Sequence, residues 1–239
     1  KERRIAADNQ ATSDLAYEAA LKALANANVQ PEEIDLIITA TITPDTFFPS
    51  TACIIQNRLK AVNAAAFDLS AACSGFVYGL SVATQFIKSG AYKKVLVVAS
   101  ETLSKIINWE DRNTCVLFGD GAGAAVLGQV DEGGILGFEL GADGSGGDVL
   151  SMPAGGSLNP ATEQTVKDKM HYIHMNGNEV FKFAIKVMGD AAQKALDNAG
   201  LDKEEIDCLV PHQANIRIIN SAAKRLKLGM DKVFVNVEK

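Results

Sequence analysis

The chain has 239 residues and a formal net charge of −6; hydrophobic residues make up 47% of it and charged residues 22%. These values are typical of a globular protein with a substantial core, and the negative charge disfavours a general nucleic-acid binder. No apolar run approaches the ~20 residues needed to cross a bilayer, so we expect no membrane association.

The first part of the chain alternates helix and strand patterns, which predicts an α/β fold. Ser13 is expected to cap a helix over residues 14–28 that buries a stripe of Leu15, Ala19, Ala23 and Ala27. A turn at Pro31-Glu32-Glu33 follows. Further helices are expected at 51–60 and from near residue 73 to 88, and strands at 34–41, 64–69, 94–100 and 119–129.

The second part is richer in loops. We expect an ordered glycine loop at 141–147, a surface loop at 153–168, a helix at 216–227 and a strand at 232–237. His171 and His174 lie in a polar stretch without an acidic partner pattern, so an exposed strand or loop is favoured there over a metal site.

An internal repeat relates the two parts. Residues 18–38 and 190–210 are identical at 11 of 21 positions without a gap, and the identity continues through the turn into the strand. Chance similarity between two alanine-rich amphipathic helices would not continue past the helix into the turn and the strand. We therefore predict two similar halves, 1–135 and 136–239, packed about a pseudo-twofold axis.

Cys73 is the candidate nucleophile. A short strand ends and a helix begins near it, and the small residues of Ala71-Ala72-Cys73-Ser74-Gly75 permit the tight turn that an exposed nucleophile requires. The positive end of the helix is expected to lower the pKa of the thiol.

The other cysteines, Cys53, Cys115 and Cys208, are interpreted as core residues. None of the four is in a CxxC motif, which argues against a zinc site or a disulfide framework and is typical of a reducing, cytoplasmic environment.

His212 is the candidate partner of Cys73. The repeat matches it to Ala40, just beyond the carboxyl end of a predicted strand, where ligands gather in α/β folds. Asn215 is expected to open the helix that follows. A capping or structural histidine is the alternative that the residues alone leave open.

Four segments in this order resemble β-ketoacyl-acyl-carrier-protein synthase III. They are Ala71-Ala-Cys-Ser-Gly-Phe76, Phe118-Gly-Asp-Gly-Ala-Gly-Ala124, Gly177-Asn-Glu-Val-Phe181 and Pro211-His-Gln-Ala-Asn215. The resemblance covers essentially the whole chain. It implies a thiolase-like fold of two βαβαβ halves layered α/β/α/β/α, here incomplete at both ends.

The resemblance also implies a reaction and roles. Acyl-CoA acylates Cys73, malonyl-acyl carrier protein loses CO₂, and the enolate attacks the thioester while His212 stabilises the developing charge. No tightly bound cofactor or metal is implied, and a homodimer is expected. Substrate-binding roles fall on Arg112, Asn215, Phe48, Phe118, Met175, Gly177 and Phe181, with Phe48 reaching into the partner subunit's pocket.

A basic face on the expected helix at 216–227 predicts docking of the acidic carrier protein. Arg217, Lys224 and Arg225 share that face, and Lys182 forms a further i, i+4 pair of positive charges with Lys186. A solvated helix face is the alternative interpretation.

The sequence departs from the family pattern at its ends. It does not begin with Met, and it stops before the Gly-Asn-Thr-Ser motif that carries the family's third catalytic residue, an asparagine, so we expect a piece of a longer chain. A related condensing enzyme of polyketide, quinolone or 3-hydroxy-3-methylglutaryl thioester synthesis stays open, as does a non-catalytic acyl-binding homologue or an inactive fragment. A thiolase stays open as well, since thiolases need a second cysteine near the C-terminus, in a region beyond residue 239. A cysteine peptidase is disfavoured, because nothing indicates a substrate cleft or a matching histidine context.

Overall fold

A computed structural model describes residues 2–238, which form two compact units. The first unit, here the sheet unit, contains Arg4–Ser104 and Gly119–Ile135. The second, the loop-rich unit, contains Lys105–Phe118, the residues from Leu136 onward, and the N-terminal Glu2 and Arg3. The predicted halves meet where Ile135 joins Leu136, but the segment Lys105–Phe118 groups with the C-terminal residues.

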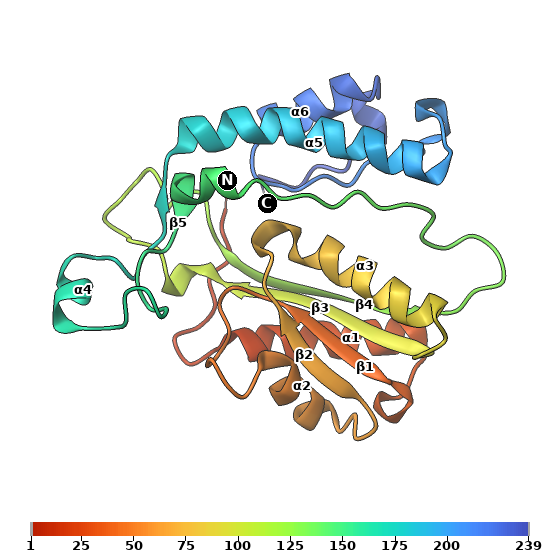
Figure 1. Ribbon diagram of the computed structural model, residues 1–239, viewed down its shortest axis with the longest axis horizontal. Coiled ribbons are helices and arrows are strands. Elements are labelled where there is room, and N and C mark those ends of the chain that lie inside the picture. Colours follow the sequence, from red (N-terminus) through yellow and green to blue (C-terminus); the bar gives the residue numbers. More distant parts are fainter. Residues whose placement is uncertain (1, 239) are drawn as a thin grey trace. The chain divides into compact units, whose positions relative to one another are not determined.

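The sheet unit is a four-stranded sheet with helices on both faces (Figure 1). Its order is β2 (Ala65–Leu69), β1 (Leu36–Ala40), β3 (Lys94–Thr102) and β4 (Asp120–Gly128). β1 is parallel to β2 and β3, whereas β4 is antiparallel to β3. The three parallel strands therefore end at one edge of the sheet, where the following loops meet.

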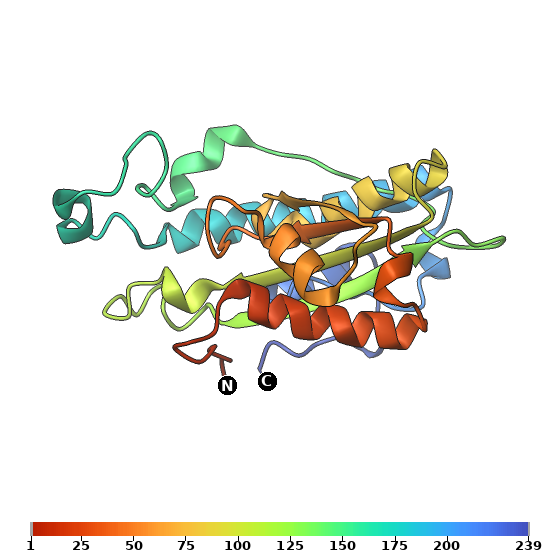
Figure 2. The ribbon, with the colours of Figure 1, turned by 90° about the horizontal axis from the view of Figure 1, so that it is seen from below.

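The two faces of the sheet have separate cores. Helices α1 (Thr12–Ala27) and α2 (Thr51–Leu59) cover one face around Leu96 and Val98. Helix α3 (Gly75–Lys88) covers the other face around Val95 and Val97 (Figures 1 and 2). Every residue of β1 is buried, as a central strand covered on both sides requires.

The prediction for the first helix was wrong in its cap and its face. α1 begins at Thr12, so Ser13 lies inside it and is buried. The Asp14 carboxylate instead accepts a hydrogen bond from the Ala11 N–H at 2.8 Å. The buried face is formed by Ala16, Ala20, Ala23 and Leu24, whereas Ala27 is exposed, because a stripe with a strict four-residue spacing drifts around a helix of 3.6 residues per turn.

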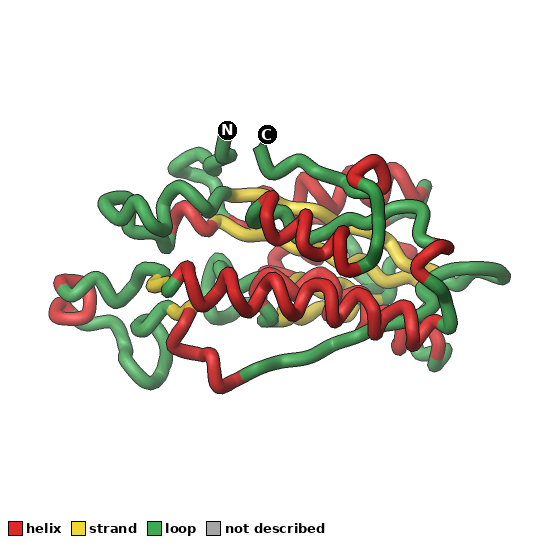
Figure 3. Tube along the Cα trace, turned by 90° about the horizontal axis from the view of Figure 1, so that it is seen from above, coloured by secondary structure: helices red, strands yellow, loops and turns green. Residues whose placement is uncertain are grey.

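The loop-rich unit is built on α5 (Gly177–Ala199) and α6 (Ile216–Arg225), which pack together. Two two-residue strands, β5 (Leu150–Ser151) and β6 (His174–Met175), pair beside the start of α5 and are otherwise surrounded by loop (Figure 3). The expected surface loop contains a short helix, α4 (Glu163–Lys167), that was not predicted. Its cap is the Thr162 hydroxyl, which accepts from the Thr165 N–H.

Two predicted strands of this unit are nearly absent. In the strand expected just before His212 and the one expected at 232–237, there is a single parallel bridge, between Leu209 and Val233. A strand needs neighbouring strands to pair its backbone N–H and C=O groups. Among residues 2–238, each of these two segments pairs only with the other one.

The repeat is confirmed as a repeat of local structure. α1 and α5 end at Asn28 and Gly200, both in the left-handed conformation, with φ of 52° and 68°. A 3-10 turn follows in each copy, Pro31–Glu33 and Lys203–Glu205. The last glutamate of each turn accepts a hydrogen bond from a backbone N–H three residues earlier, at 2.8 Å in both copies.

No helix within residues 2–238 has both the length and the apolar character that crossing a membrane would require.

Candidate active site

Cys73 lies in a tight turn between β2 and α3. After Leu69 the chain reaches Ala72, whose φ of 44° is in the left-handed region that a non-glycine residue rarely adopts. Cys73 follows in a 3-10 turn, Ala72–Ser74, that runs into α3. The predicted strand-to-helix turn at Cys73 is therefore confirmed, and the cysteine side chain is exposed.

Glycines let the start of α3 approach the sheet closely. A Cβ atom added at Gly75 would lie 2.9 Å from the Ala40 Cβ, and one at Gly79 would lie 2.8 Å from the Val97 Cγ1. Larger residues would push α3 away from the strands. The turn that carries Cys73 is thus fixed over the carboxyl end of β1.

The electrostatic prediction for Cys73 was wrong in direction. Burial by the surrounding protein raises the pKa of the thiol, although part of the side chain reaches solvent, and the Glu101 carboxylate raises it further. The backbone N–H of Cys73 acts in the opposite direction but is the smallest contribution. The backbone N–H therefore does not outweigh desolvation and the negative charge of Glu101.

Glu101 is the residue at this site that the sequence analysis missed. It lies near the end of β3, and its carboxylate accepts hydrogen bonds from the Ile42 N–H at 2.9 Å and the Thr41 hydroxyl at 3.2 Å. Burial raises its pKa, and these hydrogen bonds, with those from Thr43, lower it. The sequence did offer one indication of Glu101, namely an acidic residue directly after the predicted buried strand at 94–100.

His212 lies in the segment between the Leu209 bridge and α6. Gln213 holds this segment: its side chain donates to the Pro211 and Phe234 carbonyls at 2.9 and 3.0 Å and accepts from the Asn236 N–H at 2.9 Å. Burial lowers the pKa of His212 and so favours its neutral form. The ring still reaches solvent, and His212 belongs to the loop-rich unit whereas Cys73 belongs to the sheet unit.

Asn215 opens α6 as predicted, since its side-chain oxygen accepts from the Arg217 N–H at 2.9 Å. Arg217 and Lys224 are exposed, and the opposite face of α6 is buried, which confirms the expected amphipathic helix. Arg225 is less available because it forms an ion pair with Asp190, and Lys182 pairs with Glu179 at 2.7 Å.

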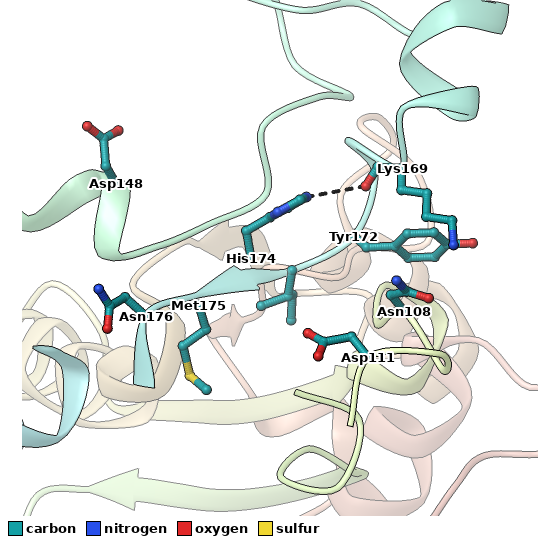
Figure 4. A pocket seen from close by; sticks show the side chains of 9 residues that line it. Asn108, Asp111, Asp148, Lys169, Tyr172, His174, Met175 and Asn176 are labelled. Carbon is teal, nitrogen blue, oxygen red and sulfur yellow. Dashed lines mark hydrogen bonds between the residues drawn. The ribbon is translucent and has the colours of Figure 1, made fainter. Parts of the chain in front are cut away.

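A pocket of about 310 Å³ lies within the loop-rich unit (Figure 4). Its lining is largely polar and consists of Asn108, Asp111, Asp148, Lys169, Tyr172, Ile173, His174, Met175 and Asn176. The Asp111 carboxylate accepts from the Asn113 N–H and the Thr114 hydroxyl, and these bonds lower its pKa.

Several predicted substrate-binding residues lie at or next to this pocket. Met175 lines it, Arg112 follows Asp111 and is exposed, and Gly177 follows Asn176. The aromatic residues are placed differently: Phe118 and Phe181 are half-buried, and Phe48 is 86% exposed.

The interpretation of the other cysteines as core residues was wrong. Cys53 is exposed in the first turn of α2, Cys208 is exposed beside the single bridge at Leu209, and Cys115 is half-buried. Among residues 2–238 no group of three or more His, Cys, Asp or Glu side chains could hold a metal ion.

A mixed α/β sheet with helices on both faces and an exposed cysteine at a strand-to-helix turn indicates the class of protein, which solved structures confirm: the chain has the thiolase-like fold. A solved structure, 3-oxoacyl-[acyl-carrier-protein] synthase III from Aquifex aeolicus VF5, superposes with a TM-score of 0.90 at 47% identity, over all of this chain and 73% of that one. The priming β-ketosynthase of the R1128 polyketide pathway gives a TM-score of 0.87 at 38% identity, over 99% of this chain and 70% of its own.

The sequence comparisons identify the family. Residues 67–144 match the family 3-oxoacyl-[acyl-carrier-protein] synthase III, and residues 196–239 match its C-terminal family. The β-ketoacyl-[acyl-carrier-protein] synthase III of Caldanaerobacter subterraneus subsp. tengcongensis is 63% identical over all of this chain and 72% of its own length, and that of Clostridioides difficile is 58% identical over all of this chain and 73% of its own. The chain belongs to the β-ketoacyl-acyl-carrier-protein synthase III family, the acyltransferases that initiate type II fatty acid synthesis.

Proposed function

We propose that Cys73 is the nucleophile that accepts the acyl group from acyl-CoA. Its sulfur would attack the thioester carbonyl, CoA would leave as the thiol, and the acyl group would remain as a thioester on Cys73. The exposed position of Cys73 in the turn before α3 is the observation that supports this role best. The backbone N–H of Cys73 is suited to stabilise the oxyanion of this step.

His212 would act in the second step. When malonyl on the acyl carrier protein loses CO₂, negative charge develops on the thioester oxygen, and the enolate carbon attacks the acyl group on Cys73. A neutral imidazole can donate one N–H to that oxygen, and the lowered pKa of His212 favours this form. The product is a 3-oxoacyl-acyl carrier protein.

The remaining residues would bind the two substrates. Arg112, Met175 and Gly177, at or beside the polar pocket, are proposed to contact acyl-CoA, with Phe118 and Phe181 lining the acyl site and Asn215 contacting the pantetheine arm. The basic face of α6 would receive the carrier protein through Arg217 and Lys224, with contributions from Arg225 and Lys182. No tightly bound cofactor is needed for this chemistry.

We further propose that the protein acts as a cytoplasmic homodimer. Phe47 and Phe48 are 83% and 86% exposed in the loop after β1, and such a pair of aromatic side chains is suited to an interface. Phe48 would enter the acyl pocket of the partner subunit.

The alternative condensing enzymes are less well supported. The relatives at 55–63% identity are β-ketoacyl-acyl-carrier-protein synthases III, whereas the polyketide priming enzyme is 38% identical. Exposed Cys73 and the presence of His212 also argue against a non-catalytic acyl-binding homologue.

The test is incubation with acetyl-CoA or a branched acyl-CoA, followed by mass spectrometry of the intact protein and of its peptides. We expect one acyl group on Cys73 and none in Cys73→Ala. Cys53→Ala is the matched control, because Cys53 is also exposed in the first turn of a helix, and it should acylate normally. An adduct that survives Cys73→Ala would refute the proposal.

A further inference from the structure

Glu101 shares a face of the sheet with the helix that Cys73 precedes. The Val97 side chain contacts α3 at Gly79, and side chains two residues apart along a strand point to the same face. Ala99 and Glu101 therefore also point toward the α3 side. Ala99 pairs with Ala40 at the carboxyl end of β1, so Glu101 lies just beyond that end.

The Glu101 carboxylate organises the segment that leaves β1. It accepts from the Thr41 hydroxyl, the Ile42 N–H and the Thr43 hydroxyl. Thr43 is held in turn by the Thr102 N–H, which donates to its hydroxyl at 3.0 Å.

The same segment is tied to the strand that leads to Cys73. The Thr41 N–H donates to the Leu69 carbonyl at 3.1 Å, and Leu69 is the last residue of β2. Three residues separate Leu69 from Cys73. One network thus connects β3, the end of β1 and the start of the nucleophile turn.

Glu101 is also the charge that acts on the thiol. Three other carboxylates near the edge where the parallel strands end have partners of their own: Asp45 accepts from the Ser13 N–H, Asp68 from the N–H groups that begin α2, and Asp120 from the Ala6 N–H and from Ser104. Burial raises the pKa of Cys73 most, and the field of Glu101 raises it further. A less acidic thiol gives a smaller thiolate fraction but a stronger nucleophile once ionised.

We propose that Glu101 is a positioning residue, which fixes residues 41–43 beside the end of β2 that leads to Cys73 and places a negative charge on the face of the sheet covered by α3, the helix that follows Cys73. This inference rests on the proposed function only in that Cys73 is the nucleophile whose reactivity is controlled. It predicts that Glu101 protects the free thiol from oxidation and non-specific alkylation, since both follow thiolate character.

The experiment measures alkylation of Cys73 by iodoacetamide as a function of pH, with peptide mass spectrometry to separate Cys73 from the other three cysteines. Hydrogen exchange of the Ile42 amide reports the position of residues 41–43. Glu101→Gln removes the charge but keeps an acceptor for Ile42, so the alkylation midpoint should move to lower pH while exchange stays slow. Glu101→Ala should lower the midpoint and also speed the exchange.

An unchanged midpoint in both variants would overturn the charge role, and slow Ile42 exchange in Glu101→Ala would overturn the positioning role. If the alanine variant does not fold, Glu101→Asp decides, because it keeps the charge but shortens the side chain. Its midpoint should stay near that of the wild type while exchange accelerates; a midpoint as low as that of Glu101→Gln would overturn the proposal. Alkylation needs no acyl-CoA, so failure of the proposed acylation would be seen separately.

Discussion

At the residue scale, partial burial lowers the pKa of His212, although its ring still reaches solvent, so its imidazole stays neutral to lower pH than an ordinary histidine. His212→Ala removes one donor to the malonyl thioester oxygen, and loss of such a donor typically costs ~2.7–4 kcal/mol of transition-state stabilisation. We expect condensation with malonyl-acyl carrier protein to fall by about 10²–10³-fold.

Acylation of Cys73 by acyl-CoA should be retained in His212→Ala, since that step does not use the enolate. His171→Ala is the control, because the His171 ring bonds to the Thr165 hydroxyl of α4 and has no proposed role in either step. Equal loss of acylation and condensation in His212→Ala would contradict the separate role of His212.

The position of Cys73 in a strand-to-helix turn could be predicted from the sequence, but the direction in which the pKa of its thiol shifts could not. Small residues between a strand and a helix are a local pattern, and they identified the turn. The charge on Glu101 lies 28 positions away in the sequence. Only the pairing of β3 with β1 brings it to the same edge, and no periodicity indicates that.

At the scale of single elements, the contact between α3 and the sheet limits what Gly79 can become. An added Cβ would meet the stiff, fully buried Val97 at 2.8 Å. We expect Gly79→Ala to destabilise the protein by about 1–3 kcal/mol despite the higher helix propensity of alanine. Urea unfolding measures this.

Gly121→Ala is the matched control for Gly79→Ala. An added Cβ at Gly121 in β4 would have no neighbour within 4 Å, and the free energy of unfolding should change little. If Gly79→Ala proved more stable than the wild type, the close approach of α3 to β3 would be wrong.

The exposed basic face of α6 is the predicted docking surface for the acidic carrier protein. Arg217→Glu reverses a charge that faces solvent, and we expect about a three- to tenfold loss of carrier-dependent condensation with acyl-CoA loading unchanged. Lys22→Glu is the control, since Lys22 is an exposed lysine on α1 in the sheet unit. A similar loss in both variants would show that net charge, not this face, matters.

Arg225 is a poorer choice for that test. Its side chain pairs with Asp190 and lies over Gly189, where an added Cβ would come within 2.5 Å of the Arg225 Cδ. A substitution at Arg225 would therefore disturb the packing of α5 on α6 as well as the surface charge.

The elements were predictable where the pattern was local. Helices α2 and α3 and the strands β1 to β3 lie close to their predicted positions, because apolar runs and caps specify them. The strands expected just before His212 and at 232–237 did not form, since apolar residues favour a strand only when neighbouring strands complete the ladder.

At the scale of the whole molecule, the exposed Phe47 and Phe48 predict self-association. Sedimentation should show a dimer, and Phe48→Ser should weaken it by more than about tenfold, as truncation of a central aromatic residue does. Val62→Ser is the control, since Val62 is 69% exposed in the turn after α2. A monomeric wild-type protein would contradict the prediction.

The two-half organisation came from the repeat and not from composition. Eleven identities across a helix and the turn that follows it identified the duplication, and the structure shows a left-handed helix end and a 3-10 turn in both copies. The segment Lys105–Phe118 could not be assigned in this way because it lies outside the repeat. Its Ile106 carbonyl accepts from the Ile173 N–H, a contact that connects it to the loop-rich unit.

The matched turns also bear on the order in which the chain acquires structure. Each is closed by partners three to five residues apart, as in the bonds from Val29 N–H to the Leu24 carbonyl and from Leu201 N–H to the Leu196 carbonyl. Contacts of such short sequence separation form within microseconds, whereas the parallel pairing of β1 with β3 must close a loop of nearly sixty residues. We therefore expect refolding to begin from two similar, independent nuclei, with assembly of the sheet as the slow phase.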